Sequence, residues 1–168
     1  MTPLYRAGSQ LIKVRGLMLF SLLCALASAW WGWDLFRTYG SLPADGGVLA
    51  PLPTRLAIGL GVASIGIAFA FGMWAYGRLY VSALGLDGAG SALRVRTVGF
   101  FGGREAALPL TDVLGSNYRA GEFTDPGGVS VNAPSISVRV KDRRWPLIID
   151  AQGDFTDRPL VAKVLKFS

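Results

Sequence analysis

The chain has 168 residues, of which 51% are hydrophobic and 17% charged, and its formal net charge is +6. Histidine is absent and Cys24 is the only cysteine, which argues against a transition-metal centre, an internal disulfide and a Ser–His or Cys–His nucleophilic pair. A soluble domain usually carries about a quarter charged residues, so this composition indicates a membrane protein, and we expect no cofactor.

Two uncharged runs predict membrane-spanning helices. Residues 16–33 lie between Arg15 and Asp34, and residues 56–77 lie between Arg55 and Arg78. At 1.5 Å per residue the runs extend about 27 Å and 33 Å, enough to cross a hydrocarbon core. Bulky tryptophans end the first run where a signal peptide would have a small-residue cleavage site, so we interpret this span as retained. Aromatic residues that favour the membrane interface end both runs: Trp30, Trp31, Trp33, Trp74, Tyr76 and Tyr80.

The flanking charges predict the orientation. Residues 37–54 form a loop rich in glycine and proline, and the two ends of this loop carry little net charge. Basic residues precede the first span and follow the second: Arg6, Lys13, Arg15, Arg78, Arg94, Arg96 and Arg104. The positive-inside rule therefore places both termini on the cytoplasmic side, or on the matrix side of a mitochondrial inner membrane.

Small residues recur at four-residue spacing in both runs and predict close helix packing. The simpler interpretation is that the two spans pack on each other; the alternative is that an outer face also docks on a larger membrane complex. The residues proposed for helix packing are Ala25, Ala29, Gly32, Ala57, Gly61, Ala68 and Gly72.

Short alternating runs after Arg78 predict a strand-rich domain. Residues 79–86 lead into a hairpin turn at Asp87 and Gly88, residues 93–98 alternate apolar and basic side chains, and Gly102 and Gly103 make the next turn. Further strands are expected at 105–110, 112–118, 136–140 and 145–149, the last in a central position because it is almost wholly apolar. Residues 121–134 are interpreted as a long loop. A short helix over 158–167 begins with Asp157 as N-cap and Pro159 in the first turn.

The expected fold class is thus a membrane α+β protein: a two-helix transmembrane hairpin followed by an antiparallel β-sheet domain with a short C-terminal helix. The domain boundaries are an N-terminal segment at 1–15, spans at 16–36 and 55–78, the loop at 37–54, and the strand-rich domain at 79–168.

The candidate contact site is a basic cluster formed by Arg139, Lys141, Arg143 and Arg144. It is either a solvated hairpin tip or a contact with anionic lipid headgroups or an acidic partner. Nucleic-acid binding is not expected, because a broad basic face with exposed aromatics is missing. Asp150, Asp154 and Asp157 lack the remaining ligand positions of a calcium loop, so turn and capping roles are favoured.

Several segments resemble the transmembrane protein 70/186/223 family of mitochondrial inner-membrane proteins, and the 223 branch most of all. They are LYR at 4–6, ALPLTDV at 107–113, VKDRRWPLIID at 140–150 and GDF at 153–155. The resemblance implies a non-enzymatic accessory subunit or assembly factor of a respiratory complex, with cytochrome c oxidase favoured, and both termini in the matrix. Met1 lies only fifteen residues before the first span, so import would use internal signals unless this is a mature or divergent form.

Partners implied are the lipid bilayer, the subunits of the respiratory complex and an anionic lipid such as cardiolipin. Complex I or ATP synthase are alternative hosts. A different hypothesis is a bacterial-type, membrane-anchored domain that senses a lipid or protein ligand.

Overall fold

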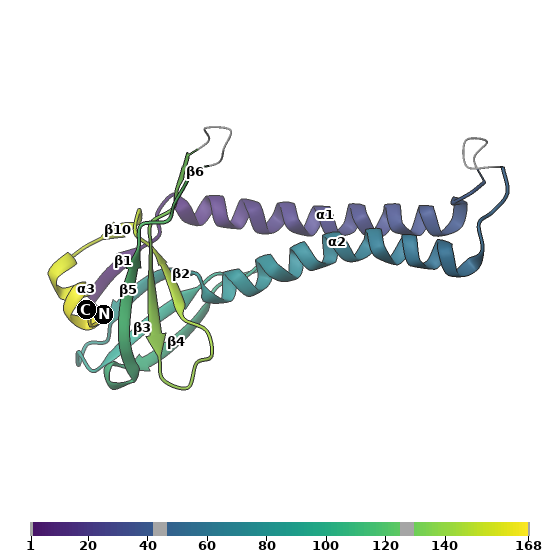
Figure 1. Ribbon diagram of the computed structural model, residues 1–168. Coiled ribbons are helices and arrows are strands. Elements are labelled where there is room, and N and C mark those ends of the chain that lie inside the picture. Colours follow the sequence, from purple (N-terminus) through teal and green to yellow (C-terminus); the bar gives the residue numbers. More distant parts are fainter. Residues whose placement is uncertain (1, 42–46, 125–129, 168) are drawn as a thin grey trace. The chain divides into compact units, whose positions relative to one another are not determined.

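The computed structural model describes residues 2–41, 47–124 and 130–167. The chain divides into two compact units: residues 16–75, and residues 1–15 together with 76–168. The first unit holds the helical hairpin and the second holds the sheets (Figure 1).

Two long apolar helices dominate the first unit. Helix α1 (Gln10–Thr38) and helix α2 (Leu52–Leu79) are both long and apolar enough to cross a membrane. Their exposed side chains are largely Leu, Ile, Phe and Trp, for example Ile65 at 70% and Trp30 at 78%. Such exposure would be costly in water and is expected in lipid. The helices extend the uncharged runs by between two and six residues at each end.

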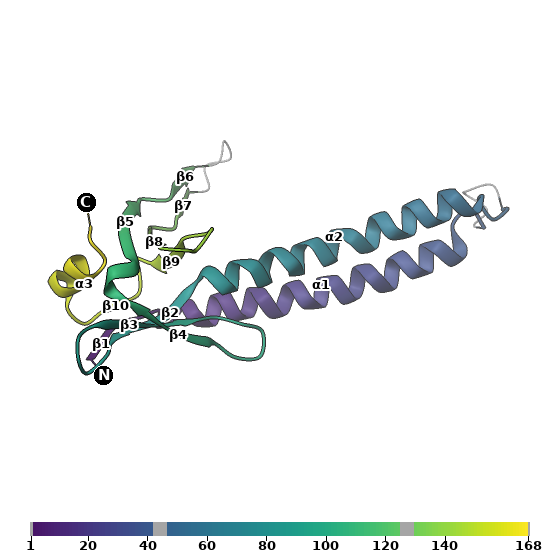
Figure 2. The same cartoon turned by 90° about the horizontal axis from the view of Figure 1, so that it is seen from below.

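The second unit is built on antiparallel ladders (Figure 2). A five-stranded sheet has the order β10-β1-β2-β3-β4, a three-stranded sheet has the order β5-β8-β9, and β6 pairs with β7. The strands are β1 (Thr2–Arg6), β2 (Val81–Leu86), β3 (Ala92–Thr97), β4 (Arg104–Pro109), β5 (Val113–Arg119), β6 (Glu122–Thr124), β7 (Ser130–Asn132), β8 (Ser135–Val140), β9 (Leu147–Asp150) and β10 (Asp154–Phe155). A short 3-10 helix, Leu110–Asp112, joins β4 to β5. The predicted α+β fold class is confirmed.

Alternation of side chains places the core between these sheets and the last helix. In β3, Leu93 and Val95 are buried while Arg94 and Arg96 are exposed, as the sequence pattern predicts. The hairpin turn at Asp87 is confirmed: the backbone N–H of Asp87 bonds to the Ala92 carbonyl, and the Asp87 side chain accepts from the Gly88 N–H. The buried residues come from every layer, including Leu4, Tyr5, Val81, Val113, Val138, Ile149, Val161 and Leu165.

Three features differ from the sequence-based expectations. The N-terminal residues form β1, which lies inside the five-stranded sheet, between β2 and β10. The segment at 121–134 is not a loop throughout, because β6 and β7 pair across it; residues 125–129 lie outside the described part of the chain.

The expected central strand at 145–149 is also corrected. It begins at Leu147 because Pro146 lacks an N–H for the ladder, and β9 lies at one end of its sheet. The apolar composition of β9 therefore does not come from a central position in the sheet. Its side chains Leu147 and Ile149 are buried, and Ile148 forms a parallel bridge with Tyr80.

Helix α3 (Arg158–Val164) begins as predicted, since the Asp157 carboxylate accepts a hydrogen bond of 3.0 Å from the Leu160 N–H.

Replacing Asp157 with alanine removes the cap and is expected to lower the free energy of unfolding by about 1 kcal/mol. Thermal denaturation of the purified chain, followed by circular dichroism, measures this change. Asp142→Ala is not a suitable control because Asp142 has a positive φ of 61°; Asn117→Ala, on an exposed strand position, should change stability by less than about 0.5 kcal/mol.

Candidate lipid and partner contact site

Three residues of the predicted basic cluster lie on the turn between β8 and β9, and the fourth, Arg139, lies in β8. The turn is closed by a hydrogen bond of 3.2 Å from the Arg143 N–H to the Val140 carbonyl, and Asp142 adopts the left-handed conformation at its tip. Lys141, Arg143 and Arg144 are all exposed. The Arg144 guanidinium lies 5.7 Å from the centre of the Trp145 ring, a cation–π contact that holds the indole at the turn.

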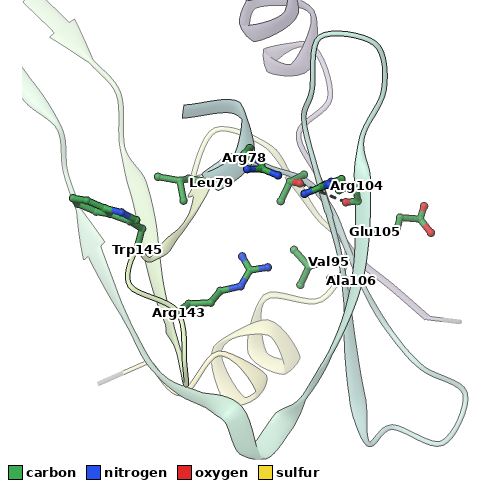
Figure 3. Close-up of a pocket in the computed structure, with 9 residues that line it drawn as sticks. Arg78, Leu79, Val95, Arg104, Glu105, Ala106, Arg143 and Trp145 are labelled. Atoms are coloured by element: carbon green, nitrogen blue, oxygen red, sulfur yellow. Dashed lines mark hydrogen bonds between the residues drawn. The ribbon is translucent and has the colours of Figure 1, made fainter. Parts of the chain in front are cut away.

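The four basic residues do not act as one group. Arg139 alternates with buried Val138 and Val140, so it projects from the outer face of β8. Arg143 instead lines a cleft of about 500 Å³ (Figure 3). The other residues that line this cleft are Arg78, Leu79, Val95, Thr97, Arg104, Glu105, Ala106 and Trp145.

Three elements contribute a guanidinium to this cleft. Arg78 comes from the last turn of α2, Arg104 from the first residue of β4, and Arg143 from the basic turn. The sequence pattern indicated Arg143 but not its grouping with the other two arginines, because they lie 39 or more positions away in the chain. The available signals were Trp145 next to the basic turn, Arg78 directly after the second apolar run, and Arg104 directly after the Gly102–Gly103 turn.

The cleft carries an excess of positive charge. Arg104 pairs across the ladder with Thr97 and Ala106 pairs with Val95, so these four side chains share one face of the β3–β4 hairpin. Glu105 alternates to the other face, where its carboxylate lies 3.7 Å from the Arg96 guanidinium, and Figure 3 shows it directed away from Arg143. The one acid among the lining residues is therefore directed away from the cleft, toward Arg96.

A second polar cluster in this unit is buried and structural. The Tyr80 hydroxyl donates to Asp150 at 3.4 Å, and Tyr5 and Tyr80 are each only 1% exposed. Burial, reinforced by the negative charge of Asp150, raises the pKa of both hydroxyls well above the usual value for tyrosine. Both rings thus stay neutral across the physiological range and are not proton acceptors.

This cluster makes stability sensitive to alkaline pH. In the unfolded chain both tyrosines ionise near pH 10, whereas in the folded chain they keep their protons to higher pH. Above about pH 10 the folded state therefore binds more protons, so stability falls with rising pH, by up to about 1.4 kcal/mol per pH unit for each tyrosine. Thermal melts between about pH 9 and pH 11 should show this loss, and Tyr80→Phe should make it smaller. Tyr118→Phe is the control because Tyr118 is 55% exposed; an equal effect there would contradict the assignment.

Within residues 2–41, 47–124 and 130–167, no three His, Cys, Asp or Glu side chains are grouped closely enough to hold a metal ion. Asp150 and Asp157 have local roles instead. Asp150 accepts from the Gln152 N–H at 2.8 Å, and Asp157 caps α3.

The helical hairpin has a tightly packed seam. A Cβ at Gly59 would lie 2.6 Å from the Gly32 carbonyl oxygen, and a Cβ at Gly66 would lie 2.6 Å from the Cys24 carbonyl oxygen. Ser28 also donates to the Ala63 carbonyl at 3.4 Å. Close backbone approach of this kind requires residues without a bulky side chain.

The seven residues proposed for helix packing divide between two faces. Gly32 lies in the seam, Ala25 contacts Gly66 there, and Ala29 lines an apolar groove of about 260 Å³ beside it. The other four are exposed: Ala57, Gly61, Ala68 and Gly72. A Cβ at Gly61 or Gly72 would meet nothing within 4 Å. Gly59 and Gly66, which make the seam on α2, were not among the seven, because four-residue spacing alone does not tell which face of a helix meets its neighbour.

Together these features define an α+β membrane protein with an apolar helical hairpin and a basic, strand-rich unit. A family model covers residues 13–164, and the chain belongs to the TMEM70/TMEM186/TMEM223 protein family. Comparison with curated proteins gave no match.

Proposed function

We propose that this protein is a non-catalytic accessory subunit or assembly factor of a respiratory complex in the mitochondrial inner membrane. Family membership over residues 13–164 is the observation that carries the proposal. Within the family we assign the chain to the transmembrane protein 223 branch, with cytochrome c oxidase as the favoured host and complex I or ATP synthase as alternatives.

Two observations support an orientation with both termini in the matrix. Strand β1 precedes α1 and pairs with β2, which follows α2, so the two ends of the hairpin lead into the same unit. Arg6, Lys13, Arg15 and Arg78 flank the hairpin on that side, in agreement with the positive-inside rule.

The outward face of α2 is the proposed contact with the host complex. Ala57, Gly61, Ala68 and Gly72 follow one another at helical spacing on a face that does not meet α1. Small residues on a lipid-exposed face permit a partner helix to approach closely, since packing drives helix association in lipid. The basic turn is proposed to contact anionic headgroups such as cardiolipin, or an acidic surface of the partner.

Native-gel separation after mild detergent extraction, with mass spectrometry of the co-migrating proteins, tests this function. Migration in fixed ratio with a mature respiratory complex identifies an accessory subunit and its host. Migration with incomplete sub-assemblies identifies an assembly factor. If the chain migrates alone, the proposal fails and a membrane-anchored sensor of lipid or protein ligands becomes the better account.

Substitutions on α2 sharpen the experiment. Gly61→Leu and Gly72→Leu change the outward face without entering the seam, so they should reduce co-migration while the chain remains folded. Unchanged co-migration of both variants would place the contact elsewhere on the protein.

A further inference from the structure

We propose that the cleft lined by Arg78, Arg104 and Arg143 binds the phosphate of an anionic phospholipid headgroup. The inference rests on the membrane placement in the proposed function and does not depend on which complex is the host. It assigns a defined site, made by three separate elements, where the basic turn alone would offer only a diffuse surface.

The arrangement of charge suits a phosphate. Guanidinium groups present paired donors that match phosphate oxygens, and three of them surround one cleft. The strand ladder directs Arg104 into the cleft and Glu105 out of it toward Arg96, so a bound anion would not face the carboxylate.

The apolar wall of the cleft favours an amphiphile over a small soluble anion. Leu79 and Ala106, both half-buried, line the cleft beside the arginines, and the buried Val95 lies at its base. A volume of about 500 Å³ falls within the range of small-molecule sites, roughly 300–1,000 Å³. Inorganic phosphate would leave this wall uncovered, whereas the glycerol and first acyl carbons of a phospholipid would cover it.

The position of Arg78 in the chain places the cleft at headgroup level. Arg78 directly follows the uncharged residues 56–77 of α2 and lies in the final turn of that helix. A guanidinium at the end of a membrane span lies at the interface, where lipid phosphates are concentrated. Trp145 lines the same cleft, and tryptophan favours this interface as well.

Lipid binding by the full chain in neutral detergent tests the site. Native mass spectrometry follows a titration with phosphatidylglycerol, and phosphatidylcholine is titrated in parallel. We expect a clear preference for phosphatidylglycerol, and an affinity about tenfold lower in R104Q/R143Q. Arg143→Gln alone, on an exposed turn, serves as a second variant should the double variant fold poorly.

Arg139→Gln is the matched control for Arg143→Gln, because it removes one positive charge from β8, just before the basic turn, but lies outside the cleft. We expect it to change the affinity by less than about twofold. An equal loss in Arg139→Gln would show a diffuse basic contact and overturn the cleft, while leaving the proposed lipid contact of the basic turn in place. Equal affinities for the two lipids would also overturn it.

Two competition arms distinguish other ligands. If millimolar inorganic phosphate displaces the lipid with the same dependence on Arg104 and Arg143, the site takes a soluble anion and the lipid assignment is wrong. If an acidic peptide does so, the cleft is a protein contact. Co-migration with a respiratory complex is measured separately, so a failed lipid site and a failed complex assignment give different results.

Discussion

Replacing Gly59 with leucine is expected to separate the two membrane helices at their closest approach. Even a Cβ at this position would lie 2.6 Å from the Gly32 carbonyl oxygen and 3.1 Å from the Phe36 Cβ, and both neighbours belong to the packed seam. Overpacking of this kind costs about 3 kcal/mol and should lower the Tm by roughly 5–10 °C. Tryptophan fluorescence during thermal unfolding in detergent measures it, since Trp33 lines the groove beside Gly59.

The same helix supplies the control for this experiment. Leucine at Gly61 or Gly72 would point into open space, so stability should change by less than about 0.5 kcal/mol. If these variants lose as much stability as Gly59→Leu, the helices do not meet along the Gly32–Gly59 seam.

The second large effect is expected at Tyr5. This ring is 1% exposed, packs 4.9 Å from the centre of the Phe155 ring, and comes from a strand between β2 and β10. Tyr5→Ala leaves a cavity under the five-stranded sheet and should cost about 3–5 kcal/mol. Hydrogen exchange should accelerate in β2 and β10 together, because both strands pair with β1.

Two further variants separate the causes of that loss. The Tyr5 hydroxyl is buried without a hydrogen-bond partner among the described residues, so Tyr5→Phe should be neutral or stabilising. Tyr118→Ala, at a position 55% exposed, should cost less than about 1 kcal/mol. A Tyr5→Phe variant as unstable as Tyr5→Ala would mean that the hydroxyl, and not the packing of the ring, stabilises β1.

The close packing around Tyr5 also explains a glycine. A Cβ at Gly153 would lie 2.5 Å from the Tyr5 ring and 2.8 Å from the Arg6 carbonyl oxygen. Only glycine permits β1 to lie this close to the turn before β10. The GDF segment at 153–155, one of the segments that resemble the family, is thus part of the contact that holds the N-terminal strand.

The sequence by itself determined the features that depend on neighbouring residues. Length and apolarity define a membrane span, alternation defines a strand such as β3, and a carboxylate before Pro159 defines a helix start. Each of these patterns lies within one element, so no knowledge of the rest of the fold is needed to read it.

Only the tertiary structure decided which distant residues meet. Strand β1 is five residues long and carries Pro3, and its partners lie about 80 and 150 positions away, so no local signal identifies it. The face of α2 that meets α1 is Gly59 and Gly66, although Gly61 and Gly72 have equally suitable spacing. The cleft also depends on tertiary packing. Arg78, Arg104 and Arg143 come together only when a helix end, a sheet edge and a turn are packed against one another.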